Sequence, residues 1–201
     1  LGDFFINISK PGQDVSTVLT KANEEMIDYI GLGVFKDDKF VGTLNTSETL
    51  YYQYVLGLSN KGKIVIADPT TEIDRLTIKF QELKTNIKPK LENNELTMNI
   101  NTEVEAQIIE QLSQFNLGRQ KIVKEIEKRI EEKLKKEVKL VINKTQQKFK
   151  SDIWGFGEYV RTHYPNYWQK IDWRKKYPQI NISMNVKAYI RQVGMINFQK
   201  T

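Results

Sequence analysis

The residues best able to do chemistry gather in one stretch, residues 150–168, which reads KSDIWGFGEYVRTHYPNYW. It contains the only histidine of the chain, His163, among six aromatic side chains. Histidine changes charge near neutral pH, so it could act as a general base or activate a nucleophile. Such catalysis also needs a positioned nucleophile and an orienting group, and no nucleophile motif accompanies His163. We therefore interpret His163 as a helix-terminal hydrogen-bonding group and predict that the chain is not an enzyme.

Metal and cofactor sites are also not expected. A single histidine and the absence of cysteine exclude multi-histidine zinc sites, thiolate sites and disulfides. The segments GLG at 31–33 and GFG at 155–157 are only fragments of a glycine-rich phosphate loop. Glu103 and Glu105 alternate with the apolar face of a predicted strand, so we expect both carboxylates to face solvent.

The charge balance suggests an alternative function. Lys and Arg number 31 and Asp and Glu 25, which gives a net charge of +6. A positive surface favours approach to anions, so the chain could be a basic module that binds nucleic acid or anionic lipid. The basic residues are interleaved with acids, however, and this pattern is typical of a solvated surface. We expect no nucleic-acid partner.

The clearest local prediction is a β-hairpin that turns at Asn93 and Asn94, between two runs of alternating apolar residues. The alternation changes parity between Phe80 and Leu83, which indicates a β-bulge. Pro89 cannot donate a ladder hydrogen bond, so its strand is expected to have an open edge there. The predicted cross-strand pairs are Glu92 with Glu95, Leu91 with Leu96, Pro89 with Met98, Ile87 with Ile100, and Leu83 with Val104.

Helical periodicity replaces this alternation over residues 117–149, where we predict one long amphipathic helix. Its apolar stripe is Val123, Ile126, Ile130, Leu134, Val138, Val141 and Thr145. The opposite face offers acid-to-base pairs four residues apart, namely Glu125 with Arg129, Glu131 with Lys135, and Glu132 with Lys136. A single stripe suggests a helix that lies across a sheet. The sequence thus predicts an α+β fold with a mainly antiparallel sheet, one long amphipathic helix packed across it, and shorter C-terminal helices.

The stretch 150–168 is predicted to be an aromatic elbow. Pro165 cannot continue a helix, so a helix should break after Tyr164. Gly157, on the apolar side, would permit close approach of a neighbouring element. The predicted structural elbow consists of Ile153, Gly155, Phe156, Gly157, Tyr164 and Pro165. Trp154 and Tyr159 lie off the apolar stripe, so they are either wrapped by the elbow or exposed for a partner. The candidate interface residues are Trp154, Tyr159, Arg161, His163 and Trp168.

The same stretch carries a resemblance to a known family. KSDIWGFGE, the Tyr-Pro pair at 164–165, Trp168, Trp173 and the tail at 191–196 resemble the C-terminal part of the Ger(x)C spore-germination lipoproteins. GLGVFKDDKFVGTLN and NIKPKLENNELTMNI are similar to two earlier segments of that family. Trp154 stands where the family usually has Phe, and residues 46–62 diverge.

The resemblance implies a function. Residues 26–201 would form the C-terminal α+β domain of a germinant-receptor C subunit, and residues 1–25 would be the tail of a preceding domain. The domain would act in spore germination by protein–protein interaction with the integral-membrane A and B subunits. The resemblance also implies the extracytoplasmic face of the spore inner membrane, an upstream lipid anchor that this sequence lacks, and neither enzymatic activity nor a cofactor.

Overall fold

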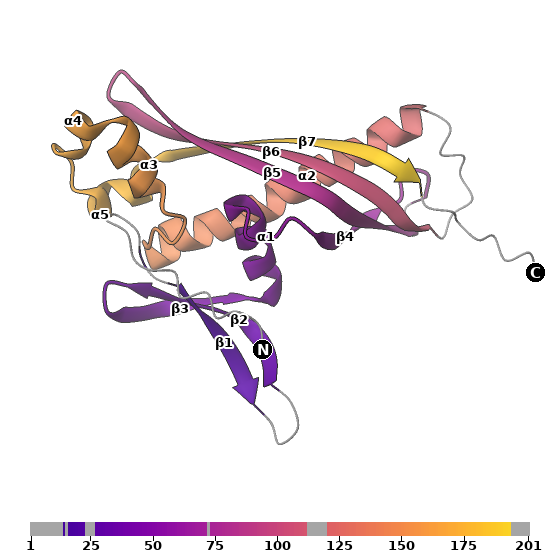
Figure 1. Ribbon diagram of the computed structural model, residues 1–201, viewed down its shortest axis with the longest axis horizontal. Coiled ribbons are helices and arrows are strands. Elements are labelled where there is room, and N and C mark those ends of the chain that lie inside the picture. Colours follow the sequence, from indigo (N-terminus) through magenta and orange to yellow (C-terminus); the bar gives the residue numbers. More distant parts are fainter. Residues whose placement is uncertain (1–13, 15, 23–26, 72, 112–119, 194–201) are drawn as a thin grey trace, which may run out of the picture.

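The protein folds into two β-sheets joined by helices, and the structure is a computed structural model that describes residues 14, 16–22, 27–71, 73–111 and 120–193. In Figure 1 a small sheet lies below and a long sheet lies above, α1 lies between them, and α2 crosses behind the long sheet. This arrangement is α+β, as the sequence predicts.

The small sheet has the order β1-β2-β3 and is antiparallel. Its strands are β1 (Ser16–Ala22), β2 (Ile27–Lys36) and β3 (Lys39–Asn45). The turn between β2 and β3 places Asp37 at a φ of 56°, a conformation that aspartate tolerates. Strand β1 belongs to the segment expected to precede the domain, yet it pairs with β2 along its length. The domain boundary after residue 25 stays a prediction.

Helix α1 (Thr46–Leu56) follows directly on β3. Asn45 is the N-cap: its side chain accepts from the Glu48 N–H at 2.9 Å, and the Glu48 carboxylate accepts from the Asn45 N–H at 2.8 Å. This reciprocal capping box provides acceptors for two backbone N–H groups that have no hydrogen-bond partner within the helix. The helix ends at Gly57, which adopts the left-handed conformation common at helix ends.

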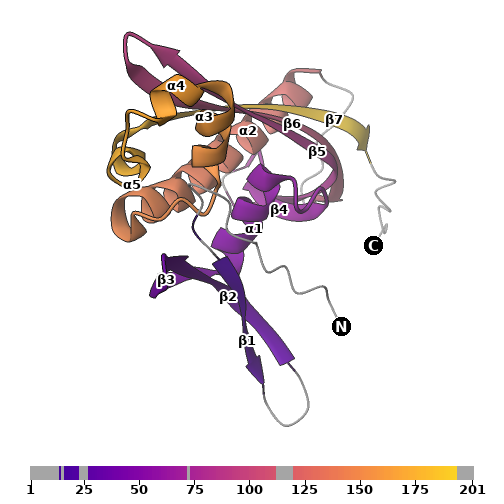
Figure 2. The same ribbon diagram turned by 60° about the vertical axis from the view of Figure 1, so that its left-hand side comes forward.

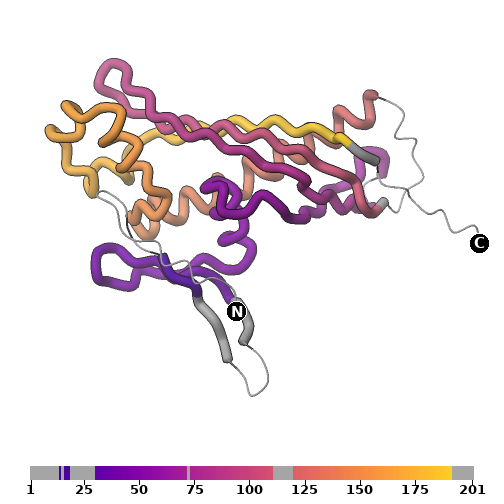
Figure 3. The backbone as a smooth tube through the Cα atoms, in the orientation of Figure 1, coloured from indigo at the N-terminus to yellow at the C-terminus, as the bar shows by residue number. Residues whose placement is uncertain are grey.

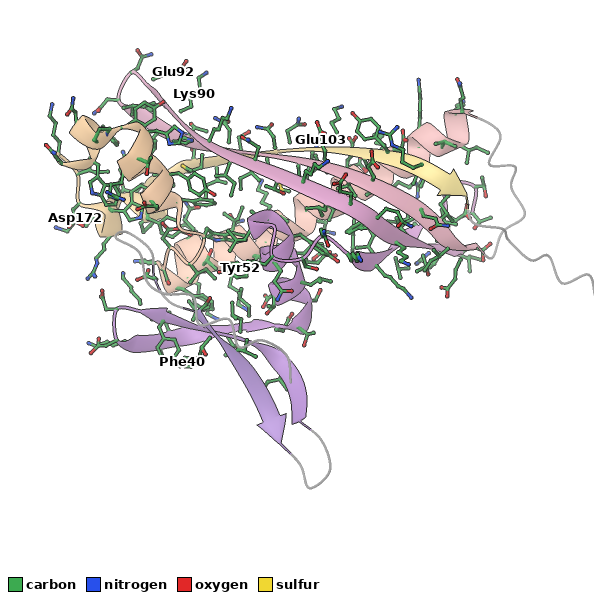
Figure 4. The ribbon with its side chains drawn as sticks, in the orientation of Figure 1. Phe40, Tyr52, Lys90, Glu92, Glu103 and Asp172 are labelled. Carbon is green, nitrogen blue, oxygen red and sulfur yellow. The ribbon has the colours of Figure 1, made fainter. Side chains whose placement is uncertain are left out.

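The long sheet has the order β4-β5-β6-β7, with β4 (Gly62–Ala67), β5 (Arg75–Glu92) and β6 (Glu95–Gln111) antiparallel. The predicted hairpin is confirmed, since all five predicted cross-strand pairs occur in the observed register. Asn93 and Asn94 turn the chain with φ values of 48° and 63°. The predicted bulge is confirmed between Phe80 and Glu82. Figure 4 shows Lys90 and Glu92 at the hairpin tip and Glu103 on the outer side of the sheet.

Strand β7 (Asn181–Val193) pairs with β6 in parallel. A parallel neighbour needs a crossover, and α2 with the short helices supplies it. The short helices are α3 (Phe156–His163), α4 (Pro165–Trp168) and α5 (Trp173–Lys176), followed by a 3-10 turn at Tyr177–Gln179. In Figure 2 they cluster at the end of the sheet where the β5–β6 hairpin projects. The predicted helix break is confirmed, because α3 ends at His163 and Pro165 begins α4.

Helix α2 (Gln120–Asn143) lies across the long sheet, and Figure 3 traces it behind strands β5 to β7. Its buried residues are Ile126, Ile130, Leu134, Val138, Val141 and Ile142. The first five belong to the predicted stripe, Ile142 was not predicted, and Val123 of the stripe is only half-buried. The α-helix stops at Asn143, however, and residues Lys144–Phe149 form a π-helical turn. The start predicted at residue 117 lies outside the described residues.

Of the three predicted acid–base pairs on α2, one is observed, Glu125 with Arg129 at 3.1 Å. Glu132 is paired with Lys128 instead, at 3.8 Å. Glu131 turns toward β7 and accepts the N–H of Ala188 at 3.2 Å. The prediction treated the helix as isolated, whereas a neighbouring strand competes for this carboxylate.

Candidate functional site

The predicted elbow is organised around the carboxylate of Asp152, which is only 3% exposed. Its two oxygens accept from the backbone N–H of Phe156 at 3.1 Å and of Gly157 at 2.8 Å, at the start of α3. The indole Nε1–H of Trp173 on α5 donates to the same carboxylate at 3.0 Å. One buried side chain therefore holds α3 and α5 together. Gly155 precedes α3 with a φ of 71°, a conformation that favours glycine.

The environment of Asp152 changes its acidity. Burial raises the pKa of Asp152 from 3.8 to about 7, while the three N–H donors act in the opposite direction. The carboxylate of Asp14 raises this pKa further. Asp14 also accepts the Asp152 backbone N–H at 2.9 Å and donates its own N–H to the Asp152 carbonyl at 3.1 Å. Asp14, which precedes β1, is thereby tied to the elbow.

Trp154 is the centre of an aromatic cluster inside the molecule. Only 1% of it is exposed, so its predicted place on an interface is corrected: the elbow wraps this side chain. Its ring stacks on Phe156 with centroids 5.9 Å apart and meets Tyr52 edge-on at 5.1 Å. Its Nε1–H donates to Thr145 Oγ1 at 2.8 Å. An indole can be buried here because its one polar group finds a partner.

Tyr52 connects the cluster to the small sheet. Helix α1 carries this side chain into the region between the two sheets (Figure 4). Its hydroxyl donates to the carbonyl of Ile153 at 3.0 Å and lies 3.5 Å from Ser16 Oγ on β1. Ser151 Oγ donates to the carbonyl of Phe35 on β2 at 3.0 Å. These bonds fix residues 151–154 against the small sheet.

The π-helical turn aims its polar side chains at the segment that leads into β7. Gln146 Nε2 donates to the carbonyls of Tyr177 at 2.9 Å and Ile180 at 2.8 Å. Thr145 Oγ1 lies 3.3 Å from the hydroxyl of Tyr177, whose pKa burial raises well above its usual value. A π-helical turn widens the helix and re-aims its side chains, and such turns are frequent at functional sites.

Tyr164 closes the elbow against the hairpin. Its hydroxyl accepts a hydrogen bond from the Leu91 N–H at 3.3 Å and donates one to the carbonyl of Pro89 at 3.5 Å. Strand β4 pairs with β5 only as far as Phe80, so none of the described strands adjoins the edge at Pro89, as predicted. The tyrosine hydroxyl supplies both a donor and an acceptor to that open edge.

The remaining candidate interface residues lie on the outside of the elbow. Arg161 and His163 are exposed, and Tyr159 and Trp168 are half-buried. Arg161 forms a two-pronged ion pair with Glu158 at 2.8 and 2.7 Å. His163 Nδ1 lies 2.9 Å from the carbonyl of Tyr159, so the interpretation of His163 as a helix-terminal hydrogen-bonding group is confirmed.

The sequence interpretation missed the polar contacts that hold the elbow, although it did place Thr145 on the inward stripe of the long helix. Asp152, Thr145 and Gln146 are all buried, and each bonds to groups far along the chain or at a helix end. A signal for Asp152 was present, because an aspartate four residues before Phe156 is placed to receive the free N–H groups of a helix start. No local signal announced Gln146, since its partners lie more than thirty residues away.

Catalytic and metal chemistry finds little support in the described residues. Within them, no group of three or more His, Asp or Glu side chains is placed to hold a metal ion. Glu105 pairs with Arg191 at 2.8 Å on the sheet surface. None of the described helices combines the length and apolar character that crossing a membrane requires.

Comparison with known proteins gives a consistent result. The family model described as "Spore germination B3/ GerAC like, C-terminal" matches residues 30–194. The chain is 26% identical over 177 residues to spore germination protein YndF of Bacillus subtilis (strain 168), covering 86% of this chain and 44% of that protein. It is 25% identical over 209 residues to spore germination protein KC of the same organism, covering 98% and 49%. The chain thus spans about half the length of these relatives.

A solved structure shares the fold. The crystal structure of the GerBC protein superposes with a TM-score of 0.77 at 24% identity, and the match covers 88% of this chain and 57% of that one. The region matched by the family model includes the whole elbow and nearly all of both sheets except β1.

Proposed function

The chain belongs to the spore germination B3/GerAC-like C-terminal family, and from this premise we propose that it is the C-terminal domain of a germinant-receptor C subunit. The match over residues 30–194 is the observation that carries the proposal, because its bounds enclose every element from β3 to β7. Three curated relatives each match more than four fifths of this chain, and all three are named as spore germination proteins.

We infer that the domain acts by binding other proteins, without catalysis. The one histidine of the chain bonds to a carbonyl of its own helix, and the buried polar residues of the elbow all serve internal contacts. A buried hydrogen-bonded network of this kind gives a rigid surface. Its partners would be the integral-membrane A and B subunits of the receptor.

The proposed location is the extracytoplasmic face of the spore inner membrane. The relatives are about twice as long as this chain, so the whole protein has room for a further domain and a lipid anchor. The outer side of the elbow, formed by Tyr159, Arg161, His163 and Trp168, is the candidate contact surface. Tyrosine, tryptophan and arginine are the residue types enriched in interface hot spots.

Deletion tests the proposal. Spores of the source organism that produce the full-length protein without residues 30–194 should fail to lose optical density when the germinant is added. Spore yield and heat resistance serve as the control, and both should be unchanged. Germination at the wild-type rate in the deletion strain would refute the proposed function.

A further inference from the structure

One face of α2 lies along the outer edge of β7. The side chains on this face differ between the first and the second half of the strand. Glu131 accepts the N–H of Ala188 at 3.2 Å, and Glu127 accepts the N–H of Ile190 at 3.0 Å. Two carboxylates thus satisfy the strand edge over its second half. Unpaired strand edges otherwise invite another chain to pair with them.

The same helix face carries lysines beside the first half of the edge. Four residues of α-helix rise about 6 Å, and two residues of a strand rise about 6.6 Å, so the two repeats stay in step. Helix and strand run in opposite directions here, since residue numbers fall along α2 as they rise along β7. Continuing the series places Lys135 beside Val186, Lys139 beside Met184, and Asn143 beside Ile182.

A lysine cannot do what the glutamates do. An ammonium group has three donors and no acceptor, so it cannot accept a strand N–H. The two-residue repeat of the strand turns the N–H groups of Ile182, Met184 and Val186 toward α2, as it does those of Ala188 and Ile190. Among the described residues, neither these three N–H groups nor the ammonium groups of Lys135 and Lys139 have a recorded partner.

A groove lies between the two elements at this point. Its volume is about 480 Å³, and its lining includes Lys135, Lys139, Asn143, Ile182 and Met184. Gln147, Gln179 and Asn181 add amide groups, and no carboxylate lines the groove. An open strand edge that faces a helix across a groove is suited to an extended peptide, which adds a strand and is selected by the flanking side chains.

We propose that this groove binds an extended acidic segment of a partner protein, which pairs with the open half of the β7 edge. The backbone carbonyls of the segment accept the N–H groups of Ile182, Met184 and Val186, and its carboxylates pair with Lys135 and Lys139. The inference rests on the proposed function, because it assigns a surface and a partner chemistry to the receptor subunit.

Photocrosslinking in the intact receptor tests this assignment. A benzoylphenylalanine replaces Asn143 in the full-length protein, and spore membranes are irradiated. We expect a crosslink to one non-helical segment of a second protein in which Asp and Glu outnumber Lys and Arg. The double change Lys135→Glu and Lys139→Glu should lower the crosslink yield about tenfold, since it reverses both charges and offers carboxylates to the strand N–H groups. The matched control, Lys121→Glu with Lys124→Glu on the same helix, should leave the yield within about twofold.

A second pair of variants tests the strand edge separately. Met184→Pro removes one outward N–H without removing a β6–β7 hydrogen bond, and proline is tolerated on strand edges. It should abolish the crosslink, whereas Met184→Leu should retain it, with the circular dichroism spectrum of both variants equal to wild type. Absence of a crosslink at position 143, a crosslink to a basic or helical segment, or a yield that the lysine reversals leave unchanged would overturn the inference. If that occurs while deletion of residues 30–194 still blocks germination, the groove assignment fails and the proposed function stands.

Discussion

Replacing Trp154 with alanine should remove the centre of the aromatic cluster and strongly destabilise the domain. The side chain is 1% exposed, so truncation leaves a cavity bordered by Tyr52 and Phe156. Truncation of a buried tryptophan to alanine typically costs about 3–5 kcal/mol of stability. This range includes the cost of losing the hydrogen bond from Trp154 Nε1–H to Thr145, because Thr145 Oγ1 keeps Ile142 and Tyr177 as hydrogen-bond partners. We expect a decrease of about 4 kcal/mol in the free energy of unfolding.

Two further substitutions separate packing from hydrogen bonding. Trp154→Phe keeps an aromatic ring and removes the indole donor. A single hydrogen bond contributes about 1 kcal/mol, so with some loss of volume the expected decrease is about 1–2 kcal/mol. Trp168→Ala is the control for a half-buried ring, whose centroid lies 5.6 Å from that of Trp173 in a tilted arrangement. It should cost about 1–2 kcal/mol.

The assay is urea unfolding of the 201-residue chain followed by circular dichroism, which does not depend on the tryptophan being removed. Iodide quenching of fluorescence gives an independent measure of exposure, and Trp168 should be quenched more strongly than Trp154. A decrease below about 1 kcal/mol for Trp154→Ala, or equal quenching of the two tryptophans, would refute the assignment of Trp154 to the interior.

Four other substitutions test packing, backbone conformation and electrostatics elsewhere in the domain. Because the pKa of Asp152 is raised to about 7 in the folded state, unfolding at pH 5–7 releases its proton, so the free energy of unfolding should fall by about 1 kcal/mol per pH unit as pH rises. Asp152→Asn should flatten that slope in urea titrations, and an unchanged slope would contradict the assignment. Gly42→Ala should cost about 2–3 kcal/mol, because φ is 152° and a Cβ would overlap the ring of Phe149. Gly57→Ala, with φ at 67° and open space around it, should cost only about 1 kcal/mol, and equal melting temperatures for the two would count against the overlap. Tyr164→Phe should cost about 1 kcal/mol and speed hydrogen exchange at the β5 edge; exchange at the wild-type rate would show that the hydroxyl does not protect it.

The β-hairpin, its bulge, the stripe of α2 and the break at Pro165 were all predictable from the sequence. Each rests on a local repeat or on the conformational limits of one residue type. A one-residue slip at the Asn93–Asn94 turn would separate every apolar pair, so the pattern specifies a single register. Proline likewise interrupts a helix whatever surrounds it.

The site depended on partners that no local pattern reveals. Trp154 could have been exposed or wrapped, and its burial follows from the arrival of Tyr52, which is about a hundred residues away along the chain. Glu131 had a lysine within reach on its own helix, yet it bonds to β7 because the parallel β6–β7 pairing brings that strand alongside. Local propensity acts over a few residues, whereas the choice between solvent, ion pair and strand edge is made by whichever element packs nearby.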